Sequence, residues 1–541
     1  MLYFIIAGRG ASIRTARRLS ANTSGAPAPE RMGGGMKFFF KRSLITGFLI
    51  GLQFLLIVVG IFTLSNKIVY VYAGLQAVSL IALILVINKK DNPSYKLSWI
   101  VVILLLPPVG VIIYMMWGNT VFTRSVKNRI NKSFEAFRFQ LPQNEQSEAE
   151  LRAFSRTYAR QSEYLKRSTG HSVYNDTETE YYSPAEAAFP HILRELKKAK
   201  RFIFIEFFIL AEGNMWDEIH AVLREKAAAG VEIKIISDDI GSSGRQQEGF
   251  MRRLETENIE MVSYNRFRPI LNTFMNYRDH RKIIVIDGVT AITGGSNIGD
   301  EYINVIDRHG YWKDTFLILR GGAAVSFTEM FLSMWQSITH RTYRLEDFCY
   351  RPQESFPAAD GFVHPYADSP FNHVDTAKNI YLQIINSARD YVFITTPYLV
   401  VDDEMLDALC LAAQSGVTVK IVTPKNGDHW YVHMMTRSSY GTLMEAGVQI
   451  YEYTPGFMHA KLIVADDSVA TVGTVNMDYR SFYLHHECGV WLCKSKTVLD
   501  VRADIDRAVS VSERIRLPAW NRRPARTKLL EAVLKLFTPL M

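Results

Sequence analysis

Two stretches of the sequence repeat the same reactive side chains at nearly the same spacing. The first reads HRKIIVIDGVTAITGGSN, from His280 to Asn297, and the second reads HAKLIVADDSVATVGTVN, from His459 to Asn476. In both, a lysine follows the histidine by two residues, an aspartate follows the lysine by five, and an asparagine ends the run. Two copies that keep these residue types in register are hard to obtain by chance, so we expect a shared chemistry.

Each stretch begins with a short, strand-like run of β-branched residues. Side chains alternate between the faces of a strand, so each histidine points the same way as its lysine. Asp287 stands at the strand end before a glycine, and an Asp-Gly pair is typical of a hairpin turn, so we interpret this aspartate as structural. The candidate catalytic set is the motif of both copies: His280, Lys282, Asp287, His459, Lys461 and Asp466.

Brought face to face, the two copies would form a cationic pocket rich in hydrogen-bond donors. Its histidines titrate near neutral pH, and Asn297 and Asn476 add amide donors. Such a pocket suits a phosphodiester, because lysines and asparagines hold the nonbridging oxygens and stabilise the transition state. One imidazole would attack phosphorus, and the other would protonate the leaving alcohol and deprotonate the incoming one. No acidic cluster of metal-binding type accompanies the motif, so we expect no metal.

The elements that must position these motifs alternate helix and strand in both halves of the chain. HILRELKKAK precedes RFIFIEFFIL in the first half, and NIYLQIINSARD precedes YVFITTPYLV in the second. Such alternation predicts sheets covered by helices, and the matching order predicts an internal duplication. Glu206 lies within the first of these strands. Its burial would be costly without a partner, so we expect it to face the cleft or a lysine.

Three long uncharged segments precede this region, at residues 43–66, 68–88 and 97–123. A helix of about 21 residues spans about 31 Å, enough to cross a hydrocarbon core, so we predict two or three transmembrane helices. Pro107 and Pro108 should kink the third. Basic clusters flank the segments on conflicting sides, so the positive-inside rule does not fix their orientation. Either one segment is interfacial or re-entrant, or one cluster lies on the unfavoured side.

The predicted fold class is α/β, with N-terminal transmembrane helices followed by two pseudo-symmetric α/β/α halves that form one catalytic unit. Arginine, serine and few acids in residues 1–35 fit a transit peptide, but we favour an over-extended start with Met36 as the working N-terminus. The predicted domains are a flexible or over-extended N-terminus at 1–42, a transmembrane region at 43–123, a connector at 124–184, a first half at 185–350, and a second half with a C-terminal helix at 365–541.

Composition narrows the classes of partner only in part. The formal net charge of +8 suits an anionic lipid surface, and in a soluble protein it would suit nucleic acid equally well. The four cysteines show no CxxC spacing, which indicates reduced thiols rather than a disulfide framework or a zinc knuckle. The stretch HHEC at residues 485–488 contains metal-ligand types. No second ligand pair with zinc spacing accompanies it, which argues against a metal site.

With these motifs the chain resembles the phospholipase D superfamily, whose signature HxKxxxxDxxxxxxG occurs twice. The segments NYRDHRKIIVIDGVTAITGGSNIGDEYIN and TPGFMHAKLIVADDSVATVGTVNMDYRSF are more closely similar to bacterial cardiolipin synthases, and the resemblance covers residues 40–541. It implies that both halves have a phospholipase D-like fold. It also implies that His280 is the nucleophile and His459 the acid and base, although the sequence alone does not distinguish the two roles.

The resemblance assigns further residues. The positions that match phosphate-binding residues of the family are Lys282, Lys461, Asn297 and Asn476. An acidic residue after each motif orients an active-site histidine in the family, and the candidates here are Glu487 and Asp314. The family often reads RSxxLNxE where this chain reads RSFYLHHE, so His485 replaces an asparagine. This departure should change the local hydrogen bonding.

The implied reaction transfers a phosphatidyl group between two phosphatidylglycerol molecules, giving cardiolipin and glycerol through a covalent phosphatidyl-histidine. No bond type is gained or lost, so no cofactor is expected. The expected partners are phosphatidylglycerol and other anionic membrane lipids rather than nucleic acid, and the expected location is the cell membrane, as a multi-pass protein. The sequence does not indicate an oligomeric state. Three alternatives remain: a phospholipase D, a membrane-tethered nuclease, and a non-catalytic lipid-binding scaffold.

Overall fold

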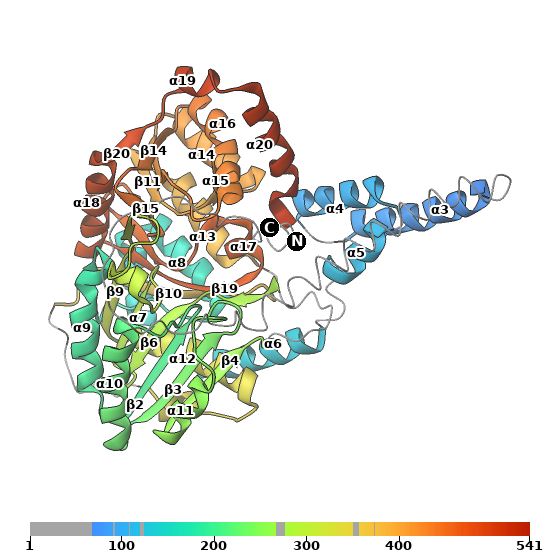
Figure 1. The fold of residues 1–541 in the computed structure, drawn as a ribbon. Coiled ribbons are helices and arrows are strands. Elements are labelled where there is room, and N and C mark those ends of the chain that lie inside the picture. The colour runs from blue at the N-terminus through green and yellow to red at the C-terminus, as the bar shows by residue number, and fades with distance from the viewer. Residues whose placement is uncertain are drawn as a thin grey trace, which may run out of the picture. The chain divides into compact units, whose positions relative to one another are not determined.

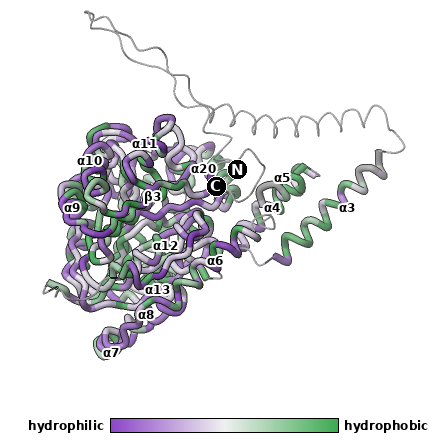
Figure 2. Tube along the Cα trace, turned by 90° about the horizontal axis from the view of Figure 1, so that it is seen from below, coloured by the Kyte–Doolittle hydropathy of each residue, from purple (hydrophilic) through white to green (hydrophobic). Residues whose placement is uncertain are grey.

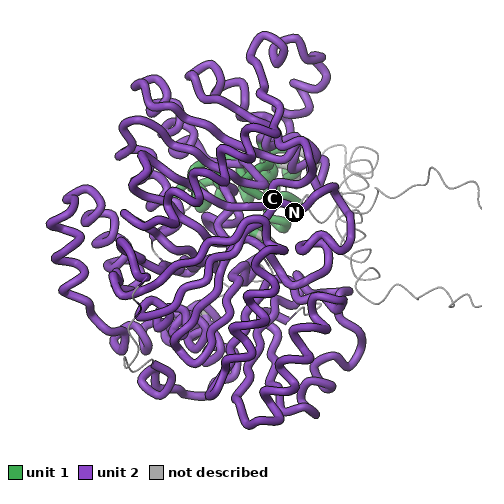
Figure 3. Tube along the Cα trace, turned by 90° about the vertical axis from the view of Figure 1, so that its left-hand side faces the viewer, with its two compact units in different colours: residues 1–120, 268–273, 536–541 green, residues 121–267, 274–535 purple. Residues whose placement is uncertain are grey.

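The computed structural model describes residues 68–89, 92–107, 109–118, 124–266, 276–349, 356, 358–372 and 374–540. The chain forms two compact units (Figure 3). Unit 1 comprises residues 1–120, 268–273 and 536–541, and unit 2 comprises residues 121–267 and 274–535. The predicted transmembrane region therefore belongs mainly to unit 1, and both copies of the histidine motif belong to unit 2.

Apolar helices make up the described part of unit 1, as the hydropathy colours of Figure 2 show. Its elements are α3 (Ile68–Ile87), α4 (Pro93–Leu105), α5 (Val109–Trp117) and the short 3-10 helix η5 (Thr538–Leu540). Trp99 of α4 packs edge-on against Tyr114 of α5, with ring centroids 5.2 Å apart. α4 ends just before Pro107, so the predicted kink is a break between two helices.

The structure describes only part of the region that was predicted to be transmembrane. Residues 43–66, its first segment, lie outside the described residues. Among the residues that are described, no helix is both long and apolar enough to cross a membrane. The prediction of two or three spanning helices is therefore not confirmed.

Two β-sheets with the same strand order form the framework of unit 2 (Figure 1). The first runs, in spatial order, β1 (Thr177–Tyr182), β9 (Phe316–Gly321), β7 (Thr290–Gly294), β6 (Lys282–Ile286), β2 (Phe202–Phe207), β3 (Glu232–Asp238) and β4 (Ile259–Tyr264). The second runs β10 (Phe362–Asp368), β19 (His485–Cys493), β17 (Val469–Gly473), β16 (Leu462–Ala465), β11 (Tyr391–Thr395), β13 (Thr418–Pro424), β14 (Gln449–Tyr453) and β20 (Ser512–Arg514). Up to β20 the orders match strand for strand, which confirms the predicted duplication. The first sheet already includes β1, inside the segment predicted as connector.

Helices pack on the sheets, as the alternating pattern predicted. They are α9 (Ala185–Lys198), α10 (Asn214–Ala228), α11 (Phe250–Thr256) and α12 (Ala324–Thr339) in the first half, and α13 (Thr376–Ser387), α14 (Asp403–Gln414), α15 (Trp430–Ser438), α16 (Tyr440–Glu445) and α18 (Lys496–Ser510) in the second. A core shared by both halves joins Phe331 of α12 and Ile505 of α18 to Phe204 of β2 and Val464 of β16. Burial of this shared apolar surface favours one folded body rather than two.

Shorter elements complete the described chain. The connector contains α6 (Arg124–Arg138), α7 (Glu145–Phe154) and α8 (Arg156–Thr169); the others are β5 (Arg278–Asp279), η3 (Asp300–Ile303), β8 (Tyr311–Lys313), η4 (Leu345–Asp347), β12 (Leu399–Val400), β15 (Gly456–Met458), β18 (Met477–Asp478), α17 (Tyr479–Tyr483), α19 (Leu517–Asn521) and α20 (Ala525–Phe537). α6 packs on α12, and α8 packs on α13 and β10. The connector is therefore part of the fold of both halves.

The motif aspartates brace the ends of the central hairpins. Asp287 and Asp466 both adopt left-handed backbone conformations, with φ of 55° and 52°. The Asp287 carboxylate accepts hydrogen bonds from the backbone N–H groups of residues 200–202, at 2.8 to 2.9 Å. The Asp466 carboxylate does the same for residues 389–391, at 2.8 to 2.9 Å. Each aspartate thus ties a hairpin turn to the start of the neighbouring strand, the kind of structural role that the turn pattern indicated for Asp287.

Replacing either brace should destabilise the protein. In Asp287→Asn and Asp466→Asn, one of the two accepting oxygens becomes an amide donor and faces an N–H group. We expect each variant to lose about 1–3 kcal/mol of unfolding free energy and to unfold at a lower temperature in detergent micelles. Asp407→Asn on α14, whose side chain is exposed, is the matched control and should unfold like the parent. Unfolding temperatures of both brace variants equal to that of the control would contradict a structural role.

Candidate active site

A short strand pair carries the first motif histidine to the second half. β5 runs parallel to the start of β19, with Arg278 beside His485 and Asp279 beside His486. The backbone N–H of His280 then donates to the carbonyl oxygen of His486, at 2.9 Å. Because β5 belongs to the first half and β19 to the second, this histidine is held at the boundary between the two.

The second motif histidine reaches the boundary in the same way. β15, which directly precedes it, runs parallel to β8 of the first half. The backbone N–H of His459 donates to the carbonyl oxygen of Lys313, at 2.8 Å. The duplication therefore produces two equivalent bridges, and each ends at a motif histidine.

Each motif histidine is hydrogen-bonded to a carboxylate of the other half. His280 Nδ1 lies 2.9 and 3.0 Å from the two oxygens of Glu487. His459 Nδ1 lies 2.5 Å from Asp314 Oδ2. Both carboxylates are completely buried. A carboxylate accepts hydrogen bonds, so Nδ1 of His280 carries the proton and leaves a lone pair on Nε2. The contact with Asp314 assigns the same tautomer to His459, whose Nδ1 also lies 2.8 Å from Lys461 Nζ.

The lysine of each motif lies beside the histidine of the same motif. Lys282 Nζ donates to the carbonyl oxygen of His280, at 2.6 Å. Lys461 Nζ donates to the carbonyl oxygens of His459 and of Gly295, the latter at 3.4 Å. All of these side chains are buried. Burial lowers the pKa of Lys282 to about 8 and that of Lys461 to about 7.

The histidines are neutral near pH 7 in the free protein. Burial, followed by the charges of Lys282 and Lys461, lowers the pKa of His280 well below its usual value of 6.5. Burial and the charge of Lys461 lower the pKa of His459 to about 4, although Asp314 acts in the opposite direction. The two motifs meet directly, since Lys461 Nζ of the second lies 3.4 Å from the carbonyl oxygen of Gly295 in the first. A neutral imidazole is the nucleophilic form.

The two motif asparagines are buried beside these groups and are held differently. Asn297 Oδ1 accepts from the backbone N–H of Ile209, at 3.1 Å, which leaves its amide nitrogen as the donor. The backbone N–H of Asn476 donates to Ser481 Oγ, at 3.1 Å. Within the described residues, Asn476 Oδ1 has no hydrogen-bond partner.

The small residues that follow each motif contact the two buried carboxylates. A Cβ atom on Gly295 would lie 2.1 Å from Asp314 Oδ1, so only glycine fits there. The equivalent residue of the second copy is Thr474, whose hydroxyl donates to Glu487. The aligned copies place Thr474 opposite Gly295, but nothing in the sequence indicated its bond to Glu487.

Aromatic side chains that the sequence analysis also missed pack against both histidines. Trp312 lies beside His459, with ring centroids 4.8 Å apart, and Phe208 lies edge-on to His280, at 5.2 Å. Trp312 precedes Asp314 by two residues, as His485 precedes Glu487 by two. Because the spacing to the carboxylate is the same in both halves, it could have identified Trp312 as the counterpart of His485.

Glu206 corrects one prediction. It is completely buried on β2 and neither faces the cleft nor pairs with a lysine. Its Oε1 lies 2.5 Å from Arg281 Nη2, and Arg281 also pairs with Asp279, at 3.1 Å. Arg281 stands between His280 and Lys282 in the sequence, so alternation turns it to the opposite face of the chain. The pair belongs to the buried framework behind the motif.

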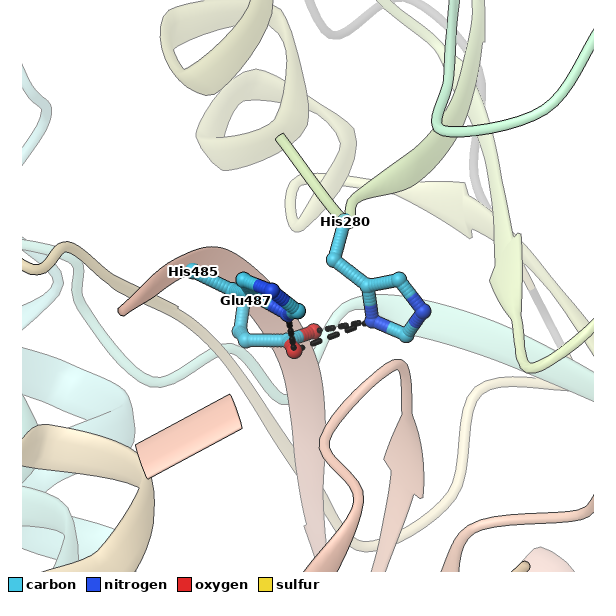
Figure 4. Close-up of side chains that lie close together, drawn as sticks. All are labelled: His280, His485 and Glu487. Carbon is cyan, nitrogen blue, oxygen red and sulfur yellow. Dashed lines mark hydrogen bonds and ion pairs between the residues drawn. The ribbon is translucent and has the colours of Figure 1, made fainter. Parts of the chain in front are cut away.

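His485 lies against the first histidine dyad (Figure 4). Its ring centroid is 5.4 Å from that of His280, and its Nδ1 is 3.6 Å from Glu487 Oε1. Among the described residues, neither ring nitrogen of His485 has a hydrogen-bond partner. The sequence analysis found no second ligand pair for HHEC. The fold instead brings His280 to it, so that three potential ligand atoms lie within 4.8 Å of one another.

Comparison with protein families agrees with this architecture. The family model described as cardiolipin synthase, PLD-like domain, matches twice, at residues 192–319 and 381–509. A phospholipase D-nuclease N-terminal model matches residues 77–119. Each PLD-like match covers the central strands of one of the two sheets.

Curated proteins are similar over most of their length. An uncharacterized protein of Streptococcus mutans is 39% identical over 456 residues, which is 84% of this chain and 98% of that protein. Cardiolipin synthases of Alkalihalophilus pseudofirmus and Halalkalibacterium halodurans are 33% and 31% identical, covering 85% and 90% of this chain and 91% and 94% of theirs.

A solved structure shares the fold at low sequence identity. Phosphatidylserine synthase of Haemophilus influenzae superposes with a TM-score of 0.51 and 12% identity, over 67% of this chain and 95% of that one. The duplicated sheets and motifs, the family model and the relatives lead to one conclusion. The chain belongs to the cardiolipin synthase family of phospholipase D-like proteins.

Proposed function

We propose that this protein is a cardiolipin synthase that transfers a phosphatidyl group from one phosphatidylglycerol to another, releasing glycerol. The observation that carries the proposal is the pair of crossed dyads, His280–Glu487 and His459–Asp314, in a member of this family. Two imidazoles and two lysines, contributed equally by the two halves, supply one nucleophile, one proton-transfer group and the positive charge that a phosphodiester requires.

In the first step, the Nε2 lone pair of His280 attacks the phosphorus of phosphatidylglycerol. A P–N bond forms and the P–O bond to glycerol breaks. His459, which takes up a proton at Nε2 when the anionic phosphodiester binds beside it, gives that proton to the leaving oxygen. Glu487 holds the attacking ring in the correct tautomer and balances the positive charge that develops on it. Lysine and asparagine side chains of both motifs hold the nonbridging oxygens.

In the second step, His459 removes the proton from the terminal hydroxyl of a second phosphatidylglycerol. The alkoxide oxygen attacks phosphorus, the P–N bond breaks, and His280 is regenerated together with cardiolipin. One phosphodiester has replaced another, so no nucleotide supplies energy and the direction follows concentration. Water must be kept from the intermediate, because its attack would give phosphatidic acid.

The substrates locate the reaction at a lipid surface. The net charge of +8 favours anionic phospholipids. On α3 the side chains of Leu80, Ile81 and Leu85 are 59%, 59% and 66% exposed, and such apolar surface favours lipid contact. We therefore propose the cell membrane as the location, and multiple spanning helices remain a prediction from the hydrophobic segments.

The protein should make cardiolipin from phosphatidylglycerol alone. In mixed micelles with a chelator and without nucleotide, we expect equimolar cardiolipin and glycerol by mass spectrometry. His280→Ala should reduce the rate by about 10³-fold or more. His220→Ala is the matched control, because His220 also pairs with a carboxylate, Glu257 at 2.5 Å, but lies on α10. Phosphatidic acid without cardiolipin would make the protein a phospholipase, and no lipid turnover would refute the proposal.

A substrate with an activated leaving group should show which histidine is the nucleophile and which is the acid and base. The p-nitrophenyl ester of phosphatidic acid has a leaving group that needs no proton, so His459→Ala should still form the phosphatidyl-enzyme. Without its base, that variant should transfer the group to alcohol about 10²–10⁴-fold more slowly. Intact-protein mass spectrometry should therefore show one added phosphatidyl group in His459→Ala and none in His280→Ala. The reverse pattern would exchange the two roles.

A further inference from the structure

Three buried ligand groups converge beside the first dyad. His280, His485 and Glu487 place potential ligand atoms within 4.8 Å of one another (Figure 4). His280 and Glu487 are already hydrogen-bonded. His485 differs from them: it is 8% exposed, and in the described part of the chain both of its ring nitrogens lack a hydrogen-bond partner. Glu487 Oε1 lies 3.6 Å from Nδ1 of His485, beyond hydrogen-bond distance, and a metal ion bound to that nitrogen would satisfy it.

The spacing of these atoms fits a tetrahedral zinc ion. Zinc binds histidine nitrogen and carboxylate oxygen at about 2.0–2.2 Å, so tetrahedral ligands lie about 3.3–3.5 Å apart. The Nδ1 atoms of His280 and His485 lie 2.9 and 3.6 Å from Glu487 Oε1, on either side of that spacing. The ligand atoms of the two histidines lie within 4.8 Å of each other, so the rings need to move closer together to bind one ion. Two histidines and one carboxylate are a known zinc ligand set, with a fourth position left for water.

The other half of the duplication lacks the equivalent group. The counterpart of His485 is Trp312, which stands two residues before Asp314 and packs on His459. An indole N–H is a donor only and offers no lone pair to a metal. Within the described residues, the ligand set thus forms beside one histidine and not beside the other.

We propose that His280, His485 and Glu487 form an inhibitory binding site for zinc or a similar transition-metal ion. The ion binds Nδ1 of His280 in place of the proton donated to Glu487. That proton moves to Nε2 and occupies the lone pair that would attack phosphorus, so metal binding blocks formation of the phosphatidyl-enzyme. The inhibition rests on the nucleophilic role of His280 in the proposed function, whereas binding of the ion does not. Hard cations such as Mg²⁺ prefer oxygen ligands and should not compete.

Metal binding is tested on the full chain in mixed micelles with Co²⁺ and Zn²⁺. We expect about one Co²⁺ per chain, with the visible absorption of a four-coordinate site, and displacement of Co²⁺ by Zn²⁺. His485→Asn should weaken Zn²⁺ binding by at least about tenfold, measured by competition with a chelating dye. His220→Ala on α10 should bind Zn²⁺ like the parent. Equal affinity in His485→Asn and the parent, or no four-coordinate Co²⁺ spectrum, would overturn the site.

Inhibition is tested separately on phosphatidylglycerol turnover. Zn²⁺ should inhibit the parent reversibly, with activity restored by EDTA, whereas Mg²⁺ should not inhibit. His485→Asn should retain turnover and need at least about tenfold more Zn²⁺ for half inhibition. Equal sensitivity of His485→Asn and the parent would overturn the inhibitory role. If no form of the protein turned over phosphatidylglycerol, the proposed function would fail, and the Co²⁺ and dye measurements would still decide the metal site.

Discussion

The hydrogen bond between each motif histidine and a carboxylate of the opposite half is the interaction on which the site depends. Glu487 and Asp314 are completely buried, where an unpaired carboxylate would be costly. Their bonds to His280 and His459 offset that cost, fix the tautomer of each ring and require both halves to be present. Neither half alone contains a complete dyad. The duplication is therefore part of the chemistry and not only of the fold.

The rest of unit 2 keeps these two bonds in place. The strand pairs β5–β19 and β15–β8 hold the histidines at the boundary between the halves. The shared core around α12 and α18 holds the two sheets, with Glu487 on β19 and Asp314 just before β9. Asp287 and Asp466 tie down the hairpin turns at the far ends of β6 and β16, away from the histidines. The symmetry is broken next to the rings, where His485 and Trp312 occupy equivalent positions. This difference separates the environments of two otherwise matched histidines.

Local patterns in the sequence were sufficient for the duplicated elements and for nominating the motif residues, whose catalytic roles stay predictions. The strand alternation, the Asp-Gly turn and the helix–strand order predicted the duplicated α/β halves, and the paired motifs predicted that two histidines and two lysines meet. The crossing of the dyads was not predictable, because it depends on contacts between residues 145 and 207 positions apart. The predicted partner of Glu206 was wrong for a related reason. The strand pattern indicated that Glu206 is buried, but it did not identify the residue that lies beside it, which is Arg281, just before β6. Comparing the copies sets Thr474 opposite Gly295 and Trp312 opposite His485, but the contacts that these residues make were not predictable from the sequence.

The central claim is that the imidazoles of the two halves face a single phosphorus atom. A crystal structure of the protein with orthovanadate, which mimics the five-coordinate phosphorus of the transition state, tests it most directly. The account predicts vanadium bonded to His280 Nε2, with His459 Nε2 directed at the opposite apical oxygen and the lysines of both motifs on the equatorial oxygens. Vanadate bound to one histidine with the other directed elsewhere, or bound away from both, would contradict it.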